Sequence, residues 1–158
     1  GGCFVLGNNL SDNSKGLELS GFDGVWDCWI YGNTFSGNTT AVNAVGTNIN
    51  WNSTGPVYYV YGGMLLLGPL GNYWDAYTGE DADGNGVGET SYTWDGGEDC
   101  YPLTETGENY VIFFDGVKVE HVLQVVEDYF TGEENEMLGR IPAPSDIFQF
   151  LNAYLGGA

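Results

Sequence analysis

Two stretches that repeat decide the fold: CFVLGNNLSDNSKGL at residues 3–17 and CWIYGNTFSGNTTAV at residues 28–42. They align without a gap at an offset of 25 residues (28 minus 3). The identical pairs are Cys3/Cys28, Gly7/Gly32, Asn8/Asn33, Ser11/Ser36 and Asn13/Asn38, and apolar positions match between them. A fixed period in this range is typical of stacked repeat architectures.

The composition of each repeat favours a parallel β-helix, because short β-forming segments are broken by Gly and Asn. Equivalent residues of neighbouring coils are then about 4.8 Å apart. Asn8 and Asn33 can therefore form an Asn ladder. Cys3 and Cys28 come close enough for a disulfide, with two buried thiols as the alternative. With Cys100 the cysteine count is odd, so at least one thiol is free or pairs with another chain.

Residues 47–63 predict a partial third coil. The alternation at Val57–Tyr61 indicates one or two strands, with a hairpin to Met64–Leu67 as one arrangement. Two clear coils are fewer than the roughly three repeats that a solenoid needs. The open edge of the first coil is therefore covered by its own chain or stacks on another molecule.

The stretch GEDADGNGVGETSY at residues 79–92 predicts a metal-binding loop. Asp81, Asp83 and Asn85 fall at alternate positions and are followed by Gly86, which matches the start of the pattern D-x-[DN]-x-[DN]-G. Alternate side chains on a tight loop direct their oxygens to one point, and an all-oxygen site of this kind favours Ca²⁺ over Zn²⁺ or Mg²⁺. The alternative is a solvated acidic turn.

The remaining calcium ligands are expected nearby. The carbonyl of Val87 and the carboxylate of Glu89 are candidates within the loop. Tyr92 occupies the position of the closing Glu, so a helix–loop–helix calcium site is not formed. The missing ligand is expected from downstream, from Asp95 or Asp99.

The repeats and the acidic loop together resemble the NosD-type parallel β-helix repeats of archaeal surface proteins. The resemblance covers about residues 3–103 and includes Gly71-Asn72-Tyr73-Trp74, the loop 81–89 and Tyr101-Pro102-Leu103. It implies a right-handed β-helix and secretion, with the calcium loop capping one end. It implies little about activity, because such modules serve enzymes, adhesins and scaffolds alike.

A second repeat follows. VEHVLQVVEDYFTG at residues 119–132 aligns with PSDIFQFLNAYLGG at 144–157, again at an offset of 25 residues (144 minus 119). The apolar spacing predicts two packed helices, with Ser145 as an N-cap and Gly156 or Gly157 as a C-cap. The pair resembles a dockerin module, which implies calcium loops and cohesin binding. Only Asp115-Gly116 remains of those loops, which favours a degenerate helical hairpin.

The predicted fold class is thus mainly β: a short right-handed parallel β-helix with a calcium-loop cap at residues 1–103, and a linker strand with two helices at 104–158. The linker strand is expected within residues 108–116.

Charge restricts the partners. The 158 residues include 22 acidic and 3 basic side chains, for a net charge of −19. Phosphate binding needs Lys and Arg, so nucleic acids and anionic membranes are disfavoured. The longest apolar run, Met64–Leu67, is too short to cross a bilayer. Neutralisation by divalent cations or salt is expected to reduce self-repulsion.

The location is expected to be extracellular or at the cell surface. Three glycosylation sequons begin at Asn9, Asn38 and Asn52, in a chain with little Lys and much Asn, Gly and Thr. The start at Gly-Gly-Cys, without an initiator Met, favours a processed product.

The side chains give little support for catalysis. The basic residues are Lys15, Lys118 and Arg140, the only His is His121, and no nucleophile triad, phosphate loop or copper-type ligand cluster occurs. We therefore expect a non-catalytic structural protein whose copies associate in a cell-surface filament or layer, or which joins other surface proteins. The alternatives are a dockerin-like docking fragment and a carbohydrate-binding or adhesion module. For the last of these the candidate aromatics are Trp26, Trp29, Trp51, Trp74 and Trp94, although core packing is favoured for each.

Overall fold

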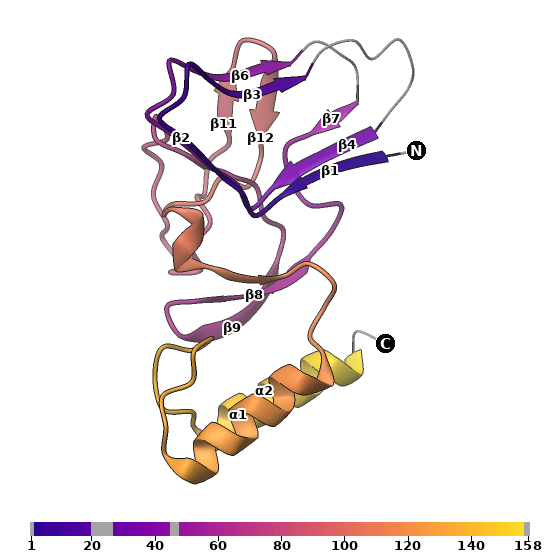
Figure 1. The fold of residues 1–158 in the computed structure, drawn as a ribbon, viewed down its shortest axis with the longest axis vertical. Coiled ribbons are helices and arrows are strands. Elements are labelled where there is room, and N and C mark those ends of the chain that lie inside the picture. Colours follow the sequence, from indigo (N-terminus) through magenta and orange to yellow (C-terminus); the bar gives the residue numbers. More distant parts are fainter. Residues whose placement is uncertain (1, 20–26, 45–47, 157–158) are drawn as a thin grey trace. The chain divides into compact units, whose positions relative to one another are not determined.

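A computed structural model describes residues 2–19, 27–44 and 48–156, and the chain forms two compact units. Unit 1 comprises Gly1–Pro56 and Pro69–Glu108, and unit 2 comprises Val57–Gly68 and Asn109–Ala158. The chain is mainly β with two C-terminal helices, as predicted (Figure 1).

Unit 1 begins with two consecutive sets of three strands. Each strand of the first set pairs in parallel with the corresponding strand of the second set. The first set is β1 (Gly2–Leu6), β2 (Asn9–Ser11) and β3 (Lys15–Leu19), and the second is β4 (Asp27–Tyr31), β5 (Thr34–Ser36) and β6 (Thr40–Ala44). In the three pairings Cys3 lies opposite Cys28, Leu10 opposite Phe35, and Leu17 opposite Val42. The predicted offset of 25 residues is therefore the register of all three pairings.

A third set of strands is shorter. β7 (Ile49–Asn50) pairs in parallel with β4, and β10 (Tyr73–Trp74) pairs in parallel with β5. Between β7 and β10 the chain leaves for a hairpin that belongs to unit 2. Unit 1 continues with the antiparallel pair β11 (Tyr92–Trp94) and β12 (Gly97–Asp99). The short 3-10 helix η1 (Gly107–Asn109) spans the point in the sequence at which unit 1 ends.

An Asn ladder joins successive sets of strands. The backbone N–H of Asn8 donates to Asn33 Oδ1 at 2.9 Å, that of Asn33 donates to Asn72 Oδ1 at 3.2 Å, and that of Asn72 donates to Asp99 Oδ2 at 2.6 Å. Asn33, Asn72 and Asp99 are each 0% exposed. The predicted ladder of Asn8 and Asn33 is thus confirmed and continues through two further residues.

The ladder also satisfies carbonyls in or next to the neighbouring strands. Asn72 Nδ2 donates to the carbonyl oxygens of Ile30 at 2.8 Å and Trp51 at 2.9 Å. Asn33 Nδ2 donates to that of Val5 at 2.8 Å. Because a buried polar group without a partner costs about 1–3 kcal/mol, each amide stabilises several backbone groups at once.

The core of unit 1 lies beside this ladder. Ile30, Phe35, Trp51 and Trp74 are buried, and the rings of Phe35 and Trp74 stack with centroids 4.5 Å apart. The equivalents of Ile30 and Phe35 in the first set of strands, Val5 and Leu10, are only half-buried.

Unit 2 combines a three-stranded antiparallel sheet with two helices. The sheet has the order β13 (Val111–Phe113), β8 (Val57–Tyr61), β9 (Met64–Gly68), and the helices are α1 (Val119–Thr131) and α2 (Pro144–Gly156). Val125 and Phe150 are fully buried in its core. The hairpin and the strand within residues 108–116 were predicted, and both are confirmed.

Two details differ from the prediction. The predicted division at residue 103 places the hairpin 57–68 in the β-helix, whereas the compact units place it with the helices, because β8 pairs with β13. The predicted N-cap Ser145 lies inside α2, which begins at Pro144, and the Asp146 carboxylate accepts the N–H of Ala143 at 2.6 Å. Gly157 lies outside the described residues.

Replacing Asn72 by Leu tests the ladder. Asn72→Leu leaves the carbonyls of Ile30 and Trp51 without their donor, and the N–H of Asn33 without its acceptor. We expect the free energy of unfolding of unit 1 to fall by at least about 3 kcal/mol in urea. All five Trp residues lie in the segments of unit 1, so their fluorescence reports its unfolding.

Asn8→Leu is the matched control. Asn8 is exposed at the end of the ladder, so water can replace its bonds and a loss of about 1 kcal/mol or less is expected. Equal losses for the two variants would contradict a stabilising role of the buried ladder.

Candidate functional site

The acidic loop folds around the carboxylate of Asp81. Its Oδ1 accepts the N–H of Asn85 at 3.0 Å and its Oδ2 accepts the N–H of Gly86 at 2.7 Å. Gly84 and Gly86 have φ angles of 75° and 85°, a conformation that a residue with a side chain rarely adopts. The turn therefore has the form that the D-x-[DN]-x-[DN]-G pattern predicted.

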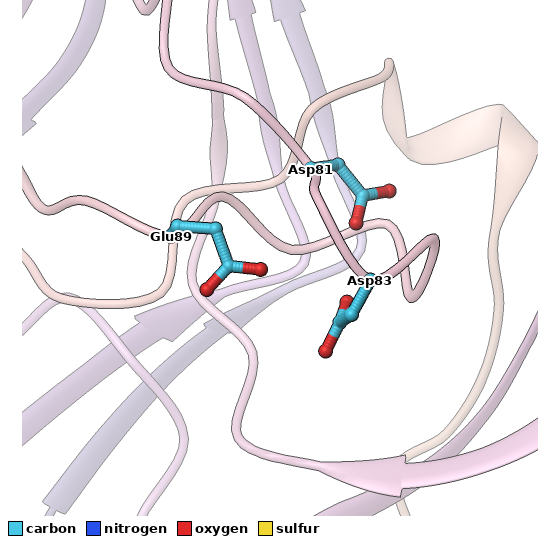
Figure 2. A group of neighbouring side chains, drawn as sticks. All are labelled: Asp81, Asp83 and Glu89. Carbon is cyan, nitrogen blue, oxygen red and sulfur yellow. The ribbon is translucent and has the colours of Figure 1, made fainter.

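Three carboxylates converge in this loop. Ligand oxygens of Asp81, Asp83 and Glu89 all lie within 4.8 Å of one another, the only such group of acidic, His or Cys side chains in the part of the chain that the structure describes (Figure 2). Two oxygens that bind the same Ca²⁺ at about 2.4 Å are at most about 4.8 Å apart, so the spacing fits this ion. Without a cation, each carboxylate pair repels by about 1 kcal/mol even in water.

The other predicted ligands have different positions. Asn85 Oδ1 accepts the N–H of Val87 at 2.7 Å, so it lies within the turn of the loop. Asp95 is exposed in the turn between β11 and β12 and does not belong to the carboxylate group. Asp99 is fully buried at the end of the Asn ladder. Neither downstream candidate thus joins the loop.

The loop is tied to the segment that follows Asp99. The N–H of Gly88 donates to the carbonyl of Pro102 at 2.8 Å, and the N–H of Thr104 donates to that of Gly86 at 3.0 Å. Tyr77 closes the base of the loop, since a Cβ at Gly79 or Gly88 would overlap its ring. The acidic loop is thereby held against residues 102–104.

The buried carboxylate of Asp99 accepts four hydrogen bonds. Its Oδ2 takes the N–H of Asn72, the Asn72 side-chain amide at 3.3 Å and the indole N–H of Trp74 at 2.9 Å, while Oδ1 takes the N–H of Tyr101 at 3.0 Å. Burial raises the pKa of Asp99 to about 6, and the hydrogen bonds from Trp74, Asn72 and Tyr101 oppose this rise. Gly71 is required beside it, because a Cβ there would overlap the carboxylate.

Cysteines and sequons also have defined positions. Cys3 and Cys28 form a disulfide, with Cα atoms 4.5 Å apart, and Cys100 is free and exposed. Of the sequon residues, Asn9 is exposed and Asn52 is half-buried. Asn38 is also half-buried and uses its amide as a second ladder, accepting the N–H of Asn13 at 2.9 Å.

Among the candidate aromatic residues, Trp51 and Trp74 belong to the core and Trp94 packs against it. Trp51 and Trp74 are buried, Trp29 stacks on Phe4, and Trp26 lies outside the described residues. Trp74 and Trp94, with Tyr92, line a cavity of about 160 Å³ whose other wall is formed by Ala41 and Val42.

The few basic side chains have local partners. Lys15 pairs with Glu18 at 2.6 Å, and Arg140 pairs with Asp146 at 2.8 Å. His121 Nδ1 accepts the N–H of Lys118 at 2.9 Å at the start of α1.

The comparisons with known proteins match one part of the chain. A family model described as "Periplasmic copper-binding protein (NosD)" matches residues 4–79, just under half of the 158 residues. Residues 4–79 are therefore similar to this family. The comparisons with curated proteins and with solved structures found no match. No helix in the described part of the chain is long and apolar enough to span a membrane.

The raised pKa of Asp99 makes stability depend on pH. Its folded pKa of about 6 exceeds the ordinary value of 3.8, so between about pH 4 and 6 the Asp99 carboxyl is protonated more often in the folded chain than in the unfolded chain. Asp99 therefore favours folding increasingly as the pH falls from 7 through 6 toward 4. An Asn side chain does not titrate, so the Asp99→Asn variant is expected to lack the rise in stability that the natural chain gains from Asp99 as the pH falls.

Carbon NMR of the Asp99 carboxyl carbon measures the titration directly. A midpoint near pH 6 is expected. A midpoint below 4 would show that the hydrogen bonds outweigh burial.

Proposed function

We propose that this chain is a non-catalytic, calcium-stabilised extracellular structural protein whose copies associate in a cell-surface filament or layer. We also propose that its parallel strands form a short right-handed β-helix of the kind found in archaeal surface proteins, and that the helices are a degenerate dockerin-like hairpin. The observation that carries the proposal is the connection of the Asp81, Asp83 and Glu89 group, through residues 99–104, to the end of the Asn ladder.

Calcium is favoured over copper. The printed name of the matching family refers to copper, which prefers imidazole, thiolate and thioether ligands. This chain has one His, three Cys and two Met, and two of the cysteines form a disulfide. The carboxylates of the loop are instead the hard oxygen ligands that Ca²⁺ takes, and backbone carbonyls and water can complete the shell.

An extracellular location is supported by two observations. The matching family is described as periplasmic, and the Cys3–Cys28 disulfide is typical of oxidising compartments. The charge of −19 also makes association of copies dependent on neutralisation by divalent cations or salt.

Calcium removal tests this proposal. A chelator is expected to lower the melting temperature measured by Trp fluorescence and to disperse any filaments or layers seen by electron microscopy. Glu89→Gln should reduce the calcium-dependent rise in melting temperature, because it removes a negative ligand. Asp95→Asn removes the same charge outside the carboxylate group and should leave that rise unchanged.

Two results would contradict the proposal. If chelation leaves the melting temperature unchanged and elemental analysis of the native protein finds no calcium, the proposed calcium binding is wrong. If the molecules stay dispersed in calcium at every protein concentration, the proposed assembly is wrong.

A glycan-binding or adhesion module is the alternative function, and the cavity of about 160 Å³ favours it. Tyr92 and Trp94 are half-exposed at its wall, and aromatic rings provide flat apolar surfaces against which sugar rings can stack. A glycan array read with the natural chain and with Trp94→Ala tests this function. Binding to defined sugars that Trp94→Ala abolishes would support it, and no binding to any sugar would contradict it.

A further inference from the structure

Helix α2 exposes a stripe of large apolar side chains. Phe148, Leu151 and Leu155 are 65%, 37% and 62% exposed, and Tyr154 beside them is 39% exposed. The first three follow one another at spacings of three and four residues, so they lie on one face of the helix. The face opposite is occupied by the buried Phe150 and Ala153, so the stripe is not needed for the core of unit 2.

The same stripe has a counterpart on α1. Leu123 and Phe130 are 61% and 78% exposed, and they are the residues that the 25-residue offset aligns with Phe148 and Leu155. The surroundings of the two stripes differ in charge. Helix α1 carries Glu120, Glu127 and Asp128, whereas the only charged side chain of α2 is Asp146, which is buried and paired with Arg140.

This difference decides which partner α2 can accept. Two copies of a chain with a net charge of −19 repel each other, and this repulsion is weakest where the facing surfaces carry no carboxylates. The exposed face of α2 is such a place, because it presents apolar side chains and the uncharged Ser145, Gln149 and Asn152. The α1 stripe does not offer such a surface, because Glu120 and Glu127 lie on the same helix beside it.

We propose that the exposed face of α2 is the surface through which two copies of this chain associate, with Phe148, Leu151 and Leu155 packed against the same residues of the second copy. The contact is isologous, so α2 and its counterpart are related by a twofold axis. The inference rests on the proposed self-association and names one surface that takes part in it; because a twofold contact closes after two copies, a filament or layer needs a further contact elsewhere on the chain.

The expected association is weak. A helix of 13 residues is about 20 Å long, so one of its faces covers far less than the roughly 800 Å² per partner of a stable interface. A dimer should therefore form at high protein concentration and dissociate on dilution. High salt should strengthen it, because salt screens the charge of the two copies.

Sedimentation equilibrium of the complete chain in calcium, over a wide concentration range and at low and high salt, tests the surface. Phe148→Gln with Leu155→Gln is expected to weaken association about tenfold or more. The matched control, Leu123→Gln with Phe130→Gln, removes equivalent apolar residues from α1 and should leave association unchanged. Circular dichroism and melting curves check that both variants fold, as expected for exposed positions.

Asn152→Asp supplies a second variant of nearly the same shape. It adds a carboxylate beside the stripe, and the twofold axis places two such charges at the interface. Association should therefore weaken at low salt and recover at high salt. An adventitious hydrophobic contact elsewhere would not respond to this change.

The outcomes separate the two proposals. If the natural chain assembles and the α2 variants assemble equally well, the α2 surface is wrong and the proposed function stands. If association is lost only in the α1 control, the copies meet through α1 instead, and the α2 surface is again wrong. If the natural chain stays monomeric under all conditions, both proposals fail.

Discussion

The hydrogen bonds of Asn72 are the interaction on which unit 1 depends. This one buried side chain donates to the carbonyls of Ile30 in β4 and of Trp51 directly after β7, accepts the backbone N–H of Asn33 and lies against the carboxylate of Asp99. A buried amide with every group satisfied holds several chain segments in one register, whereas the same amide with a missing partner is costly. The N–H of Leu103 donates to the carbonyl of Asn72 at 2.9 Å, so the segment 99–104, to which the acidic loop is bonded, also lies against this residue.

Asp99 ends the ladder because it differs chemically from Asn. An Asn side chain accepts at one end and donates at the other, so each rung can bond the next. A carboxylate only accepts, and the four donors around Asp99 use both of its oxygens. The same burial that places it there also raises its pKa. Stability and its pH dependence are therefore linked through one residue, which directly precedes the segment that holds the acidic loop.

The sequence predicts the parts of this fold that recur at a fixed spacing. The 25-residue period places Asn8 against Asn33 and Cys3 against Cys28, and the second period places the two helices. Asn72 was not recognised as the next rung because it follows Asn33 by 39 residues. Most of the additional length is the hairpin at residues 57–68, which leaves unit 1 and pairs with β13.

The sequence predicts those residues of the candidate site whose contacts are local. Asp81, Asp83 and Glu89 lie within nine residues of one turn, so their convergence follows from the loop pattern. Asp95 and Asp99 were assigned by sequence distance alone. Their positions depend on the β11–β12 hairpin, whose pairing directs Asp95 to solvent and Asp99 to the ladder. No motif in the chain signals such a long-range burial of a carboxylate.

Native-state hydrogen exchange of the Asn72 backbone amide tests the central role of the ladder most directly. Its N–H donates to a fully buried carboxylate, so it should exchange only when unit 1 unfolds globally, with the same free energy as urea unfolding. The N–H of Asn8 at the exposed end of the ladder should exchange through local opening. Exchange of Asn72 as fast as that of Asn8 would contradict the account.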